Sequence, residues 1–427
     1  MFKKSKIALT VVLAMLLCAA SFTSAFATNL DGNGALTGDE NNPVEAAISK
    51  DLRLPTGTNV PSANFIFEVE AKTVDNVAFN PDAPNMPILG TLSKPGIGTF
   101  TLSFSQADAS WKKPVTGLVN TDSIKKETGD IFAGVTFPHA GVFVYEVTER
   151  ADTNEPIDAA GNMNEWLSYS GAKYQLTVYV EYKADGVTTF VYGLGTRTIL
   201  KDDGADGDGF KVDPTPGGYG EEYSHSEMMF TNDYVRNNGP FEPEDAKSTL
   251  AISKQVAGDF ASKEQLFHFT IDLMVPSIVP NPPAHYKAYL IDVNGSVLTP
   301  HIEVSTSTTT SFSLKHGQSL VFVDTPVGTG YAVTEAAPAN YIPSVRVITG
   351  GGTPNDIPGV LNTALSTGNQ HVGEQPNSAA FTNTRDSVTP TGLNLNDLPF
   401  ILLIALGLGA LTTFVVLKVR KGKQNYR

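Results

Sequence analysis

Apolar and polar residues alternate with a period of two in many short segments of the chain. Successive side chains of a β-strand point to opposite faces of its sheet, so this period predicts strands with one buried face. The apolar members of the clearest segments are Phe65, Phe67 and Val69; Phe143, Tyr145 and Val147; Tyr174, Leu176, Val178 and Val180; and Phe267, Phe269, Ile271 and Leu273. Turn-forming residues are frequent, with 38 glycines and 27 prolines. We therefore predict an all-β fold of two tandem antiparallel β-sandwich (Ig-like) domains.

Polar segments without this alternation divide the chain. Residues 28–45 have no periodicity and are interpreted as a flexible leader. A second stretch rich in Asn, Gly, Pro and acidic residues, 236–247, is interpreted as a linker between domains. The sandwiches are accordingly predicted at 46–235 and 248–385.

The N-terminal segment combines three early lysines with an apolar run from Ile7 to Ala20, followed by small residues, Ala25 and Ala27, at the usual cleavage positions. This arrangement predicts a secretory signal peptide over 1–27, because the apolar run is too short to span a bilayer. Cys18, the sole cysteine of the chain, lies inside it. The exported protein would therefore contain no disulfide.

The C-terminal segment is predicted to anchor the chain in a membrane. Residues 398–417 form an uncharged stretch of twenty residues, long enough for a transmembrane helix. The basic tail 418–427 follows it, and the positive-inside rule places such a tail in the cytoplasm. Residues 386–397 are interpreted as a spacer between the second sandwich and the helix.

Charge and motif content exclude several functions. The net charge of −14 argues against a nucleic-acid partner, since phosphate binding requires an excess of basic residues. The seven histidines form no zinc-binding pattern, and the nucleophile-elbow and phosphate-loop motifs are absent from the sequence. We predict no metal, no cofactor and no enzyme acting on an external substrate. The acidic run 202–209 misses the EF-hand spacing and favours a hairpin loop, with calcium binding left open.

Three short strings occur in both predicted sandwiches in the same order. They are Ala-Ile-Ser-Lys at 47–50 and 251–254, Tyr-Glu/Ala-Val-Thr-Glu at 145–149 and 331–335, and Phe-Thr-Asn at 230–232 and 381–383. In each string the last residue shares a strand face with an apolar residue two positions away. If those apolar residues face the core, each sandwich also buries a lysine, a glutamate and an asparagine.

Such buried groups are expected to meet, because burying them singly would cost several kcal/mol each. An apolar pocket disfavours both charges, so it lowers the pKa of the lysine and raises that of the glutamate. The neutral amine can then attack the asparagine carbonyl while a protonated glutamate polarises that carbonyl and moves protons. Ammonia leaves, and an isopeptide bond forms without a cofactor. The alternative is that the lysines reach solvent and the glutamates lie on the surface.

The first sandwich resembles the streptococcal pilin isopeptide-linkage domain. The resemblance rests on a lysine in the first strand, the Gly141 to Glu149 strand and the closing Phe230 to Tyr234 segment. It implies a bond between Lys50 and Asn232 that Glu149 catalyses.

The second sandwich is similar to collagen-adhesin B-type repeats and their pilin relatives. That similarity implies a bond between Lys254 and Asn383 that Glu335 catalyses.

The segment before the apolar stretch, Val-Thr-Pro-Thr-Gly at 388–392, resembles a cell-wall sorting signal of Gram-positive surface proteins. The resemblance implies that a sortase cuts between Thr391 and Gly392 and joins Thr391 to peptidoglycan or to another pilin subunit. The usual signal begins with Leu-Pro, whereas Val388 and Thr389 stand here, so the sortase class stays open.

We thus expect a structural protein of a Gram-positive cell surface, either a pilus subunit or a wall-anchored stalk, held together by intramolecular isopeptide bonds. The alternative is a surface adhesin that binds a host or matrix ligand and is retained as a plain single-span membrane protein.

Overall fold

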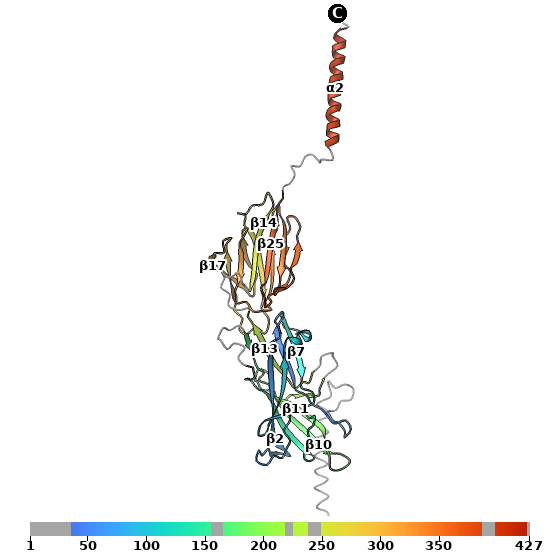
Figure 1. Ribbon diagram of the computed structural model, residues 1–427, viewed down its shortest axis with the longest axis vertical. Helices are drawn as coiled ribbons and strands as arrows, with labels where there is room; N and C mark the ends of the chain where they lie inside the picture. Colours follow the sequence, from blue (N-terminus) through green and yellow to red (C-terminus); the bar gives the residue numbers. More distant parts are fainter. Residues whose placement is uncertain (1–35, 155–164, 218–224, 238–248, 387–397, 425–427) are drawn as a thin grey trace, which may run out of the picture.

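The structure is a computed structural model that describes residues 36–154, 165–217, 225–237, 249–386 and 398–424. The predicted signal peptide and the sorting residues Thr391 and Gly392 lie outside these ranges. Two β-domains follow one another along the chain, each built from two sheets (Figure 1). The all-β prediction is confirmed.

The first domain contains a five-stranded and an eight-stranded sheet. The five-stranded sheet has the order β6 (Lys113–Pro114), β7 (Thr121–Glu127), β1 (Ser49–Pro55), β13 (Met229–Arg236) and β9 (Glu165–Leu167). The other has the order β12 (Lys211–Val212), β11 (Thr189–Leu200), β10 (Lys173–Tyr182), β8 (Gly141–Glu149), β2 (Ala63–Val74), β5 (Ile97–Phe104) and β4 (Thr91–Lys94), with β3 (Val77–Ala78) paired to β2. A 3₁₀ helix, η1 (Gln106–Trp111), precedes β6.

The second domain repeats this plan with seven and five strands. The larger sheet has the order β17 (Val297–Ser305), β16 (His285–Ile291), β19 (Ser319–Phe322), β14 (Leu250–Ala257), β25 (Ser378–Thr384), β21 (Ile342–Ile348) and β22 (Asn355–Pro358). The smaller has the order β18 (Thr310–Leu314), β15 (Phe267–Met274), β20 (Gly330–Glu335) and β23 (Leu365–Ser366), with β24 (Gln370–His371) paired to β20.

The first and last strands of each domain are neighbours, and they run parallel. β1 pairs with β13 in the first domain and β14 with β25 in the second. The predicted antiparallel sandwiches thus each contain one parallel pair. Alternation reveals which face of a strand is buried but not its direction, and a parallel pair is possible here because a whole sandwich connects its two strands.

Aromatic side chains fill the space between the sheets at matching positions in the two domains. Phe230 of β13 packs on Phe67 with ring centroids 5.1 Å apart. Phe381 of β25 packs on Phe269 at 5.2 Å. All four rings are buried. The third repeated string therefore places one phenylalanine in each core, two residues before its asparagine.

Polar contacts join the two domains around Glu374. Its carboxylate accepts hydrogen bonds from the backbone and side-chain nitrogens of Asn59, at 2.6 and 2.5 Å, and from Arg236 at 3.3 Å. The Val327 N–H donates to the Arg236 carbonyl at 2.9 Å, which adds a backbone bond across the junction. These contacts connect the end of β13 to the second domain without passing through the linker.

The C-terminal helix α2 spans Leu398–Gln424. Its segment Leu398–Lys421 contains an 18-residue stretch with a mean hydropathy of 2.6 and is long and apolar enough to cross a membrane. This agrees with the predicted span at 398–417, and the helix continues into the basic tail.

Candidate functional site

The first cluster of sequence-predicted residues is assembled from three strands. Lys50 lies on β1 and Asn232 on its parallel neighbour β13, where Lys50 is in register with Phe230 and Leu52 with Asn232. Because side chains alternate along each strand, Lys50 and Asn232 share the face that points at the other sheet. Glu149 ends β8 in that opposite sheet.

The three side chains meet at one carboxylate. The Lys50 Nζ lies 2.7 Å from Glu149 Oε1 and 2.9 Å from Oε2. The Asn232 Nδ2 donates to the same Oε1 at 2.9 Å. The side chains of Lys50 and Glu149 are 0% exposed, and the ammonium also lies 4.5 Å from the centre of the Phe65 ring. The cluster is therefore closed to solvent, and the alternative of a lysine that reaches solvent does not hold for Lys50.

The carbonyl end of the Asn232 amide faces a backbone donor. The Ser170 N–H donates to Asn232 Oδ1 at 2.6 Å and lies 3.2 Å from Glu149 Oε2. Ser170 belongs to the segment between β9 and β10, which carries none of the repeated strings. A carboxylate in front of Nδ2 and an N–H in front of Oδ1 fix the orientation of the amide, because the flipped amide would place like groups together.

This orientation corrects one expected role. The glutamate was expected to polarise the asparagine carbonyl, but Glu149 faces Nδ2, the nitrogen that would leave as ammonia. The physical reason is that Glu149 Oε1 acts as a hydrogen-bond acceptor here, and the NH₂ end of an amide is its donor end. The donor at the carbonyl oxygen is Ser170. Sequence reasoning missed it, because a backbone N–H leaves no signal in residue patterns.

Burial shifts the acid–base properties of the pair. It lowers the pKa of Lys50 to about 8, although the neighbouring charge of Glu149 opposes the shift. Burial also raises the pKa of Glu149 above its usual value, again opposed by the partner. Both shifts make the neutral forms, an amine and a carboxylic acid, more accessible than they are for the same groups in water.

The second cluster has the same construction. Lys254 on β14 is in register with Phe381, and Val256 with Asn383 on the parallel strand β25. Glu335 ends β20 in the opposite sheet. The Lys254 Nζ lies 2.7 Å from Glu335 Oε1, and both side chains are 0% exposed.

The Asn383 amide also presents its nitrogen to the glutamate, since Nδ2 donates to Glu335 Oε1 at 2.7 Å. Burial lowers the pKa of Lys254 to about 8 and raises that of Glu335. The second glutamate is thus inside the domain, and the alternative of a surface position does not hold.

The two clusters differ at the carbonyl oxygen. Within the described part of the chain, Asn383 Oδ1 and Glu335 Oε2 are buried without a hydrogen-bond partner. The first domain supplies the Ser170 N–H at both equivalent atoms. The sites also differ at the lysine, because Lys254 Nζ lies 2.7 Å from Glu335 Oε1 without hydrogen-bond geometry, whereas Lys50 Nζ donates to both oxygens of Glu149.

The acidic run 202–209 forms the connection between β11 and β12. Its Asp202 Oδ1 accepts from the Thr231 N–H at 2.9 Å and from the Ser170 hydroxyl. In the described ranges, no group of three or more His, Cys, Asp or Glu side chains could hold a metal ion. The run thus supports the segment that carries Ser170, and calcium binding has no geometric support in the described loop.

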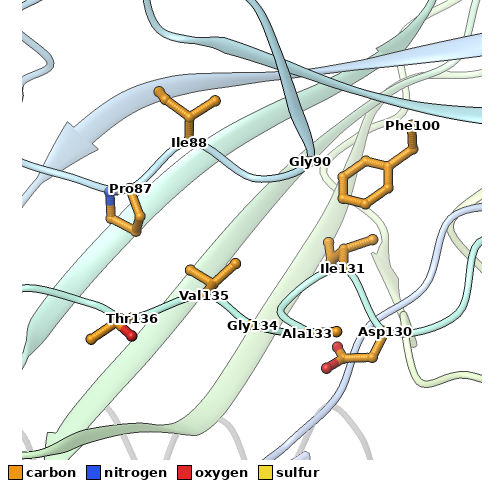
Figure 2. A pocket seen from close by; sticks show the side chains of 10 residues that line it. All are labelled: Pro87, Ile88, Gly90, Phe100, Asp130, Ile131, Ala133, Gly134, Val135 and Thr136. Atoms are coloured by element: carbon orange, nitrogen blue, oxygen red, sulfur yellow. The ribbon is translucent and has the colours of Figure 1, made fainter.

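A pocket of about 530 Å³ lies elsewhere in the first domain, between the loops around Pro87 and Val135 (Figure 2). Its only charged lining residue is Asp130, whose Oδ1 accepts backbone bonds from Ala46 and Phe132 at 3.1 Å. That carboxylate organises a loop. The pocket contains no residue of either Lys-Glu-Asn cluster.

Two known families match the chain, one for each domain. Residues 47–235 match the Spy0128-like isopeptide containing domain. Residues 248–385 match a domain of unknown function, DUF7601. The similarity of the second domain to collagen-adhesin B-type repeats stays a prediction.

Relatives from Streptococcus pyogenes cover most of the chain. A pilin of serotype M1 is 24% identical over 415 residues, which are 94% of this chain and 97% of that protein. The crystal structure of the major pilin covers 80% of this chain and 99% of its own, with 20% identity and a TM-score of 0.32. The T3.2 major pilin covers 80% and 98%, with 21% identity and a TM-score of 0.30.

The family match covers the domain that holds the Lys50 cluster, and the serotype M1 relative extends over both domains. Residues 47–235 therefore match the Spy0128-like isopeptide containing domain family, and nearly the whole chain is similar to a pilin of Streptococcus pyogenes.

Proposed function

We propose that this protein is a tension-bearing pilus or wall-stalk subunit, and that an intramolecular isopeptide bond links the first and last strands of each domain. The observation that carries the proposal is a buried pair of hydrogen bonds, in which Lys50 Nζ and Asn232 Nδ2 both contact Glu149 Oε1. The matching cluster of the second domain supports the same chemistry there.

The reaction needs only the three side chains. In the neutral form of the ion pair, Lys50 Nζ attacks Cγ of Asn232, and the resulting Nζ–Cγ bond replaces the Cγ–Nδ2 bond. Glu149 gives its proton to Nδ2 and takes one from Nζ, so ammonia leaves and the carboxyl is regenerated. Glu149 Oε1 already contacts both nitrogens, which is the arrangement such a proton transfer requires. Each domain performs the reaction once.

The position of the bond suits a protein under tension. Force on a surface-anchored chain enters a domain near its first strand and leaves near its last. A covalent link from β1 to β13, or from β14 to β25, carries that force between neighbouring strands, and the sheets between them need not separate. Thiol reductants cannot open such a link.

Anchoring at the surface is the second part of the proposal. The signal peptide directs export, α2 holds the chain in the membrane with residues 418–427 in the cytoplasm, and a sortase joins Thr391 to peptidoglycan or to another subunit. The length and hydropathy of α2 support a membrane span, and the basic residues within 418–427 support this orientation.

Single-molecule pulling tests the structural role. Held through both ends of the two-domain region, the protein should extend very little before the tether detaches. Lys50→Ala should add one unfolding event with the length of the first domain, and Lys254→Ala one with that of the second. Lys315→Ala is the matched control, because Lys315 pairs with Glu264 on the surface and should leave the trace unchanged. Full extension of the unsubstituted domains under ordinary unfolding forces would contradict the proposal.

A further inference from the structure

The Ser170 N–H occupies the position where negative charge would develop during bond formation. When an amine adds to an amide carbon, the carbonyl oxygen becomes an oxyanion until the leaving group departs. A fixed backbone donor aimed at that oxygen is the arrangement that stabilises such an intermediate. The donor lies 2.6 Å from Asn232 Oδ1 in a buried site, where hydrogen bonds to charge are strong.

The segment that carries this donor is fixed to β13 on both sides of Asn232. On one side, the Ser168 N–H donates to the Asp233 carbonyl, and the Asp233 N–H donates to the Ser168 hydroxyl, both at 2.9 Å. On the other side, Asp202 accepts from the Thr231 N–H and from the Ser170 hydroxyl. The Ser170 N–H is thus held opposite the residue between the two attachments.

Close packing of the Asp202 loop keeps the segment in place. The Gly171 N–H donates to the Asp202 carbonyl at 2.7 Å. A Cβ at Gly171 would lie 2.9 Å from the backbone nitrogen of Gly204, so the loop approaches this closely only because residue 171 is glycine. The donor is therefore positioned before any reaction begins, and such preorganisation is the source of oxyanion stabilisation.

We propose that the Ser170 backbone N–H is the oxyanion donor for formation of the Lys50–Asn232 bond, and that Asp202 acts as a positioning residue for it. The inference rests on the proposed isopeptide chemistry. As Nζ adds to Cγ, the C=O electron pair moves to Oδ1 and is held by this N–H. It returns when the Cγ–Nδ2 bond breaks and ammonia leaves with the proton from Glu149. The N–H donates a hydrogen bond throughout and transfers no proton.

The second domain offers an internal comparison. Asn383 Oδ1 has no hydrogen-bond partner in the described residues, so the oxyanion there lacks such a donor. The Lys254–Asn383 bond should therefore form more slowly than the Lys50–Asn232 bond in the same molecule.

Replacing a single backbone N–H by oxygen tests the donor without altering a side chain. The full chain is made by cell-free translation, once with serine and once with glyceric acid, the α-hydroxy analogue of serine, at position 170. The two products differ only in an amide or an ester at residue 170. Samples taken over time are denatured and digested, and the fraction of linked Lys50–Asn232 peptide is measured by mass spectrometry. Alkaline cleavage of the ester verifies its incorporation.

The matched control is the same amide–ester pair at Ser168. The Ser168 N–H lies in the same segment as the Ser170 N–H. It donates to the Asp233 carbonyl on β13 but does not touch the Asn232 side chain. The Lys254–Asn383 bond, followed in every sample, reports that the rest of the chain folds.

The ester at residue 170 should slow the Lys50–Asn232 bond on the order of 100-fold, the effect expected for loss of one oxyanion donor. The ester at 168 removes one attachment of the segment and should slow the bond by no more than about tenfold, the effect that loss of one ordinary backbone hydrogen bond can have. Equal rates for the amide and ester at 170, or equal slowing at 168 and 170, would overturn the inference. Absence of the linked peptide from the unsubstituted protein would instead overturn the proposed function.

A second measurement tests Asp202 with the N–H intact. Asp202→Ala removes the acceptor for Ser170 Oγ and Thr231 and should slow the first bond while leaving the second unchanged. Asp203→Ala is the control in the same loop, because Asp203 contacts only the neighbouring Ala205 N–H among the hydrogen bonds described. Identical kinetics of the two variants would contradict the positioning role.

Discussion

Lys50 and Asn232 stand on adjacent parallel strands, one pleat repeat out of register, and both reach the same oxygen, Glu149 Oε1. Neither strand is near the other in sequence, so the contact closes most of the first domain into a loop. The parallel direction matters because both side chains then incline the same way along the sheet. Lys254 and Asn383 repeat the relationship around Glu335.

A cross-link at this position should stabilise the domain through its unfolded state. It closes a loop of about 180 residues, and by analogy with disulfides of that size it would contribute about 4–5 kcal/mol. Asn232→Ala removes the bond but keeps the Lys50–Glu149 pair, so its first domain should lose roughly that free energy of unfolding. Denaturant titration measures this.

Asn383→Ala provides the reciprocal control for that experiment. It should destabilise the second domain and leave the unfolding of the first unchanged. If Asn232→Ala unfolded at the same denaturant concentration as the unsubstituted protein, the bond would contribute nothing to stability.

The pH dependence of bond formation should differ from that of an exposed lysine. The reactive form holds one proton on the pair, as neutral amine and protonated Glu149. Above the Lys50 pKa of about 8 that proton is lost, leaving the amine beside an ionised carboxylate without a proton donor. The rate should therefore fall above about pH 8. Below the raised pKa of Glu149 the amine is protonated as well, so the rate should also fall in acid.

The time course of linked peptide in newly translated protein, measured from acid to alkaline pH, checks this profile. Asp202 and Asp51 also act on Lys50 through their charges, and both favour its protonated form. Asp202→Ala should therefore move the alkaline limb to lower pH. A rate that increases steadily toward the usual lysine pKa of 10.5 would show that Glu149 takes no part.

The proposed sortase cleavage after Thr391 can be tested outside the two domains. Thr391→Ala should leave the protein in the membrane fraction with its basic tail attached, because a sortase would have no threonine carbonyl to transfer. Thr389→Ala, two residues earlier, is the control and tests whether that departure from the usual signal matters. Normal amounts of Thr391→Ala protein in the wall fraction would contradict the sorting role.

The contacts of Glu374 lead us to expect a stiff junction between the domains. Its carboxylate, 8% exposed, holds Asn59 and Arg236 together. Glu374→Ala should increase the range of interdomain angles seen by small-angle scattering and leave both cross-links intact. Glu264→Ala, on an exposed ion pair within the second domain, should leave the scattering unchanged.

Much of this arrangement could be predicted from the sequence because strand alternation constrains side-chain direction. Glu149 is an even number of positions from Phe143, so its carboxylate lies on the core face. Lys50 and Asn232 are likewise an even number of positions from buried apolar residues of their strands. The repeated strings identified the second cluster in the same way. Burial in the structure follows this even spacing at all of these positions.

Other features had no such signal. The alternation of side chains along a strand does not reveal the direction of that strand, so the sequence did not predict the parallel pairs. The Ser170 N–H is a backbone group in a segment without periodicity, and its position depends on a loop far along the chain. Asp202 was interpreted as one of several solvated carboxylates, whereas its Oδ1 contacts β13.

The intact mass of the purified protein tests the central claim most directly. Each Lys–Asn bond releases one ammonia, so the two-domain protein should weigh two ammonia masses less than its sequence. Glu149→Ala and Glu335→Ala should each restore one, and the double variant both, whereas Glu264→Ala should restore none. A mass equal to that of the unmodified sequence would contradict the account.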